Sequence, residues 1–119
     1  FRRFQKELLI VHAHPFRDGN QFVRLDCVHG IEVVNTHPNH KNHNELALEA
    51  FRKYPHLYPL CGSDTHQKGQ ECASWVRVEH PLRDIQDYIR AVRQGAYTLG
   101  CKGEEYSRIL QEVAQLRAR

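Results

Sequence analysis

Short apolar runs alternate with amphipathic segments along the first half of the chain. Three of these runs predict strands, at residues 8–11, 30–35 and 57–61. The first run is continuously apolar, which is typical of a strand buried on both faces of a parallel sheet. Between the strands, a short segment within 18–29 and a longer one over 45–54 have helical spacing. The order strand, helix, strand, helix, strand predicts an α/β fold of parallel strands with crossover helices.

The ends of these segments carry signals of their own. Asn44 is a good N-cap for the helix at 45–54, and Pro55 ends that helix. Pro15 stops the first strand and favours an extended backbone at His14. We therefore expect His14 to lie at the carboxyl end of the first strand.

The second half of the chain predicts two further strands and two further helices. A shorter strand is expected at 75–78, followed by a helix at 82–94 that ends at Gly95. An edge strand at 96–99 and a final amphipathic helix at 104–116 complete the chain. A length of 119 residues suits one domain with a modest core. Because the chain contains no methionine and starts at Phe1, we expect it to be a piece of a longer polypeptide.

Composition excludes several classes of protein. A hydrophobic content of 40% and a charged content of 26% are typical of a globular protein, not a disordered one. A net charge of +3, without a basic stripe, gives no direct indication of nucleic-acid binding. No apolar run approaches the roughly 20 residues of a membrane span, so a cytoplasmic protein is the default expectation. The four cysteines form no C-x-x-C pair, which disfavours a zinc finger.

The segment Gly62-Ser63-Asp64-Thr65-His66 offers candidate chemistry directly after the third predicted strand. If Asp64 and His66 stay extended, their side chains project from the same side of the chain. A carboxylate oxygen and an imidazole nitrogen are a mixture that zinc, manganese or iron accepts. The alternative is a turn in which Asp64 caps the next element and His66 is exposed. Ligands of parallel α/β sheets bind at the carboxyl ends of the strands, where His14 and Asn35 are also expected.

Four segments, taken in order, resemble the polymerase and histidinol phosphatase (PHP) superfamily over roughly residues 8–100. They read AHPFR, GIEVVN, NHN before an alanine-rich helix, and GSDTH. The resemblance implies a partial distorted (β/α)7 barrel, with residues 1–119 as the carboxyl-terminal portion of one PHP domain. The amino-terminal strands of that barrel, with the family's H-x-H motif, are absent from this sequence. We expect them to come from another piece of the same parent chain or from a partner copy, or this chain to have been trimmed from an intact enzyme.

The resemblance also implies a function, the hydrolysis of a phosphate ester by metal-activated water. His14, Asp64 and His66 match ligands of the family's divalent metal ions, zinc, manganese or iron. Asp64 is further expected to orient the attacking water, and the guanidinium of Arg17 suits a phosphate oxygen. The implied substrate is a phosphorylated small molecule or a nucleotide, and the fragment alone is expected to be inactive. The alternative is a non-catalytic PHP remnant that acts as an interaction or regulatory module of a larger protein.

The remaining polar residues near these motifs have two interpretations each. A packed or hydrogen-bonded role is favoured for His12, and the alternative is that it supports the metal ligands or occasionally acts as one. Asn35 is expected to bond to backbone at its strand end, with facing the substrate as the alternative. His37, His40 and His43 occupy a polar loop, where solvated side chains are favoured over metal binding.

Overall fold

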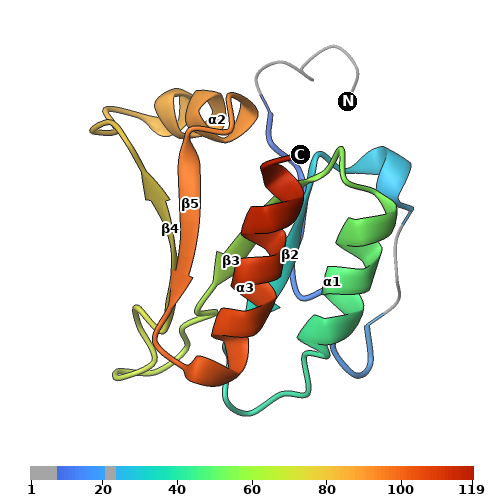
Figure 1. Cartoon of the computed structure of the whole chain (residues 1–119). Coiled ribbons are helices and arrows are strands. Elements are labelled where there is room, and N and C mark those ends of the chain that lie inside the picture. Colours follow the sequence, from blue (N-terminus) through green and yellow to red (C-terminus); the bar gives the residue numbers. More distant parts are fainter. Residues whose placement is uncertain (1–7, 21–23) are drawn as a thin grey trace.

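The computed structural model describes residues 8–20 and 24–119 and contains a three-stranded parallel sheet (Figure 1). The strands are β1 (Val11–His12), β2 (Gly30–Asn35) and β3 (Tyr58–Gly62), in the order β1-β2-β3. This sheet confirms the parallel arrangement predicted for the first half of the chain. The first strand is shorter than expected, because only Val11 and His12 pair with β2.

The second half of the chain departs from the predicted parallel arrangement. Strands β4 (Ser74–Val78) and β5 (Tyr97–Cys101) form a separate antiparallel pair, with Val76 opposite Leu99. The helix between them, α2 (Ile85–Arg93), lies across the end where β4 finishes and β5 begins (Figure 1). Helix α2 does not run back along β4. Strand β5 therefore begins at the end where β4 finishes, and the two strands are antiparallel. The described strands form two sheets and do not close into a barrel.

Two helices cover one face of the parallel sheet. Helices α1 (Asn44–Lys53) and α3 (Glu104–Arg117) lie side by side, and both contact β2 (Figure 1). The core between them and the sheet includes Ile31, Val33 and Phe51, each at most 1% exposed. Both helices follow their predicted ranges closely. Within 18–29, the described residues form only the 3-10 turn Leu25–Cys27, whereas residues 21–23 lie outside the description.

A smaller core lies on the other side of β3, where α2 contributes Val92 to a cluster with Leu60 and Tyr97. Helix α2 begins three residues later than predicted. Asp84 is its N-cap, and its side chain accepts a hydrogen bond from the backbone N–H of Asp87 at 2.9 Å. The helix ends at Arg93, and Gly95, with a φ of +69°, follows its C-cap Gln94 and terminates it as predicted. None of the helices in the described residues has the length and apolar character needed to span a bilayer.

Candidate functional site at the carboxyl edge of the parallel sheet

A β-bulge in β2 shapes the polar site at the carboxyl edge of the sheet. Glu32 is paired with Leu60 and Val34 with Cys61, so Val33 is the extra residue. In a regular strand, side chains three positions apart would point to opposite faces. The bulge brings Glu32 and Asn35 to the same side, and the Asn35 Nδ2 donates a hydrogen bond to the Glu32 Oε1 at 2.6 Å.

Asn35 is the centre of the polar network that follows from this bulge. It is 1% exposed. Its Oδ1 accepts hydrogen bonds from the backbone N–H of His37 at 2.9 Å and from Arg17 Nη2 at 3.1 Å. Its backbone carbonyl accepts bonds from the side-chain amides of Asn42 and Asn44 at 3.1 and 3.0 Å. Asn35 therefore does bond to backbone, as predicted, and its amide also joins the side chains around it.

The predicted N-cap role of Asn44 is wrong. Asn44 is the first residue of α1, and the residue before it, His43, occupies the cap position with a φ of +51°. The Asn44 Oδ1 instead accepts a hydrogen bond from the backbone N–H of Asn35 at 3.0 Å. The Asn44 side chain therefore bonds to the end of β2 and does not cap its own helix. This contact holds the start of α1 next to the site.

Arg17 and Asp64 meet beside Asn35. Their side chains form an ion pair with 2.5 Å between Nη2 and Oδ2, and Arg17 Nε also donates to Asn42 Oδ1 at 2.8 Å. Partial burial acts to raise the pKa of Asp64, but the hydrogen bond and charge of Arg17 outweigh it and hold that pKa below its ordinary value. Asp64 is therefore ionised in the folded protein at neutral pH.

Asp64 and His66 are not held together by an extended strand. Asp64 has a φ of +52°, so the expected alternation of side chains does not apply to this segment. The His66 Nδ1 lies 2.7 Å from the backbone carbonyl oxygen of Asp64, an acceptor, so Nδ1 is the protonated nitrogen. The His66 side chain is 62% exposed, and its Nε2 is left to accept a proton or bind a ligand.

His14 also departs from its predicted extended backbone, since it has a φ of +31°. Its backbone N–H donates to Glu32 Oε1 at 2.9 Å, and this bond supports a conformation that Pro15 alone would disfavour. The His14 Nδ1 lies 2.9 Å from the Asn20 side-chain amide. The imidazole of His14 thus belongs to a different hydrogen-bonded group from Asp64 and His66.

The loop after β2 contributes more to the site than predicted. His37 is only 6% exposed, which contradicts the expectation of a solvated side chain. Its ring centroid lies 4.6 Å from that of His40 and 4.9 Å from that of His66. Burial, followed by the charge of His40, lowers the pKa of His37, so its ring is neutral at neutral pH. His43 contacts the Asp18 carboxylate at 2.8 Å.

Glu32 is the functional candidate that the sequence interpretation missed. Burial raises its pKa, against the opposing hydrogen bonds from Asn35 and His14. Its Oε2 lies so close to Gly62 that a Cβ there would come within 2.8 Å of it, so a larger residue at 62 would displace the carboxylate. A glutamate inside the β-branched run of β2 is the signal that could have revealed this buried acid.

The described residues do not form a complete metal site. Among them, no group of three or more His, Cys, Asp or Glu side chains is close enough to hold a metal ion. His14, Asp64 and His66 lie at one edge of the sheet, yet the Asp64 Oδ2 is engaged by Arg17 and Asn35. His12 is half-buried, and burial, followed by the charge of His14, lowers its pKa. That His12 supports the metal ligands stays a prediction.

The two carboxylates of the site predict opposite effects of pH on stability. The lowered pKa of Asp64 contributes stability above about pH 3.8 that is lost as pH falls through the folded value. The raised pKa of Glu32 contributes stability below about pH 4.5 that is lost as pH rises through the folded value. Urea unfolding between pH 3 and 7 measures both effects. Asp64→Asn should lose less stability than the native chain as pH falls, and Glu32→Gln should lose less stability than the native chain as pH rises. Parallel pH profiles for both variants and the native chain would contradict this assignment.

Comparison of the chain with models of protein families, with curated proteins and with solved structures finds no match.

Proposed function

We propose that this chain carries part of the active site of a metal-dependent phosphoesterase of the PHP type. The observation that carries the proposal is the ion pair between Arg17 and Asp64, which lie 47 residues apart in the sequence. These residues belong to the AHPFR and GSDTH segments, and they meet at the carboxyl edge where parallel α/β sheets bind ligands. A partial distorted (β/α)7 barrel, with residues 1–119 as its carboxyl-terminal portion, belongs to the same proposal.

The residues of this chain have separate tasks in the proposed reaction. Arg17 binds an oxygen of the phosphate ester, because its planar guanidinium matches phosphate geometry. Asp64 and Asn35 hold the guanidinium in place through the bonds to Nη2. Oδ2 of Asp64 is engaged by these contacts, so Oδ1, which lies 3.7 Å from His66 Nδ1, is the oxygen that orients the attacking water.

A bound zinc, manganese or iron ion would supply a water of lowered pKa to this reaction. His14, Asp64 and His66 are the residues proposed to contribute ligands. Because no complete group exists among the described residues, the remaining ligands must come from elsewhere. The amino-terminal part of the barrel, in the parent chain or in a partner copy, is the proposed source. The substrate is a phosphorylated small molecule or a nucleotide.

Replacing Asp64 with Ala is expected to lower metal-dependent hydrolysis by about 100-fold or more, since the oxygen that positions the water is lost. The measurement is turnover of p-nitrophenyl phosphate and bis-p-nitrophenyl phosphate, together with metal content, in the full polypeptide that contains this chain. Asp26→Ala is the matched control, because the Asp26 side chain is 61% exposed and forms its ion pair with Arg24 outside the site. Full activity of the Asp64 variant would remove Asp64 from the site.

A second function, a non-catalytic interaction or regulatory module, is favoured by one feature of the same site. The Arg17 side chain is 11% exposed and is already bonded to Asp64, Asn35 and Asn42, as in a structural ion pair. Such a network would hold the sheet and loops together without any chemistry. A parent polypeptide that binds no metal and hydrolyses neither ester would favour this alternative and reject the phosphoesterase.

A further inference from the structure

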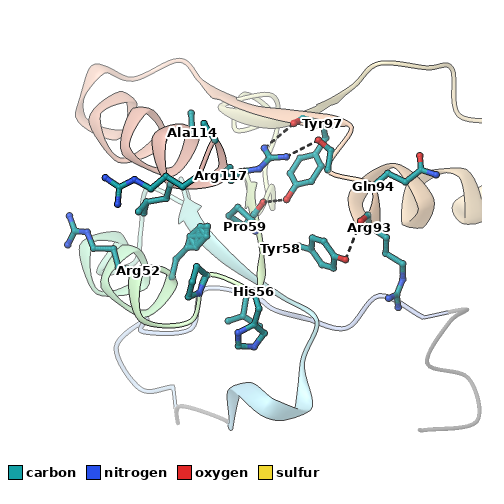
Figure 2. Close-up of a pocket in the computed structure, with 16 residues that line it drawn as sticks. Arg52, His56, Tyr58, Pro59, Arg93, Gln94, Tyr97, Ala114 and Arg117 are labelled. Atoms are coloured by element: carbon teal, nitrogen blue, oxygen red, sulfur yellow. Dashed lines mark hydrogen bonds between the residues drawn. The ribbon is translucent and has the colours of Figure 1, made fainter.

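A cavity lies at the end of the molecule opposite the candidate site. It has a volume of about 930 Å³ and is lined by the start of β3 and by the carboxyl-terminal ends of α1, α2 and α3 (Figure 2). The candidate site, in contrast, lies at the end of β3 and the start of α1. The residues that line the cavity therefore include none of those in the polar network around Asn35.

The walls of this cavity are basic. Four arginines and one histidine line it, at 52, 56, 93, 117 and 119, and the described lining contains no Asp or Glu. Helix dipoles oppose this charge, because each carboxyl-terminal end carries about half a negative charge. Glu112, outside the lining, offsets one more charge through its ion pair with Arg52. The four full charges of the arginines exceed these opposing contributions, so the residues that line the cavity carry a net positive charge.

Arg117 is held in position within the cavity. Its Nη1 and Nη2 donate to the backbone carbonyl oxygens of Tyr97 and Gly95 at 2.9 and 3.1 Å. Its guanidinium carbon lies 3.9 Å from the centroid of the Tyr97 ring, a cation–π contact. Burial raises the pKa of Tyr97 to about 12, so this phenol is neutral and does not cancel the charge. The described partners of Arg117 are thus neutral, and none of them cancels the positive charge of its guanidinium.

The opposite wall of the cavity provides rings. Figure 2 shows Arg117 and Tyr97 on one side of the pocket and His56 and Tyr58 on the other. Tyr58 is half-buried and its hydroxyl donates to the carbonyl oxygen of Arg93 at 3.3 Å, which fixes the ring. A volume of about 930 Å³ greatly exceeds that of a single inorganic ion and falls in the range of cavities that hold small organic molecules.

We propose that this cavity binds a small organic anion, with its phosphate or carboxylate on Arg117 and its flat body against Tyr58 and His56. The two anionic groups share the chemistry that a guanidinium recognises. The proposal does not depend on the phosphoesterase function, because it concerns residues at the other end of the molecule.

The test measures binding of defined probes to the whole chain by isothermal titration calorimetry. AMP presents a phosphate and a ring, benzoate a carboxylate and a ring, and adenosine a ring without charge. AMP, benzoate or both should bind at least about 10-fold more tightly than adenosine, since hydrogen bonds to a charged group are stronger than those to a neutral one. Binding of AMP would identify phosphate as the preferred anionic group, and binding of benzoate would identify carboxylate. Failure of both anions to bind at millimolar concentration would overturn the proposal.

Matched variants locate the binding. Arg117→Gln should weaken the bound anion about 10-fold or more. Arg108→Gln removes the same charge from an exposed position of α3 outside the cavity and should have little effect. His56→Ala changes an exposed side chain on the opposite wall and should also weaken binding, which keeps the test valid if the Arg117 variant unfolds. Equal affinities of the Arg117 and Arg108 variants, or loss only in Asp64→Ala, would overturn the assignment to this cavity.

Discussion

Replacing Asn35 with Asp is expected to destabilise the protein by about 3 kcal/mol or more at neutral pH. The substitution hardly changes the size of the side chain, but it replaces two N–H donors with a carboxylate oxygen. That oxygen would face the Glu32 Oε1, now 2.6 Å from the amide nitrogen, and the Asp64 Oδ2, now 3.4 Å from it. Three carboxylates would then share one buried site with the single charge of Arg17 to offset them.

The sign of the pH dependence makes this prediction specific. Burial and the neighbouring carboxylates would raise the pKa of the new aspartate, so its cost grows as pH rises and shrinks toward pH 4. Urea unfolding of Asn35→Asp and the native chain at several pH values measures this difference. Asn39→Asp is the control, because Asn39 is exposed in the loop after β2 and tolerates a charge. A small cost at Asn35 that does not vary with pH would show that the amide is not the centre of the network.

The elements that the sequence predicted best are those set by local patterns. The strand at 30–35 and the helix at 104–116 are found within one residue of their expected bounds, because short apolar runs and helical apolar spacing act over a few residues. The antiparallel pairing of β4 with β5 was not predicted. Its direction depends on where α2 lies relative to the strands, and apolar spacing within α2 carries no information about that placement.

The sequence predicted where the site lies better than it predicted which residues contact one another there. The expectation that functional residues lie at strand ends placed Asn35 and Asp64 at one edge of the sheet, where hydrogen bonds connect them to each other and to Arg17. The bulge at Val33 could not be predicted from the sequence, since it arises from the register between β2 and β3. It aligned Glu32 with the site, so a buried acid was missed. Positive φ angles at His14 and Asp64 were missed for the same reason, because tertiary hydrogen bonds override the local preference.

The site and the core are connected through α1. Its first residue, Asn44, bonds the end of β2, and its last turn contributes Phe51 to the core between the helices and the sheet. Phe51 is 1% exposed, so its ring is among the most completely buried side chains of the described chain. The position of Asn44, and with it the orientation of Asn35, therefore depends on the packing of one helix against the sheet.

Replacing Phe51 with Ala should accordingly cost about 3–5 kcal/mol, the range for removing a buried aromatic ring and leaving a cavity. Leu46→Ala on the same helix is the control, because Leu46 is 40% exposed and its truncation should change stability by only about 0.5 kcal/mol. Chemical denaturation followed by circular dichroism measures both. If unfolding of the native chain is two-state, the Asn35 network is lost together with the core. A cost for Phe51→Ala no larger than that for Leu46→Ala would mean that α1 is not anchored through this ring, and that the site is held by its polar contacts alone.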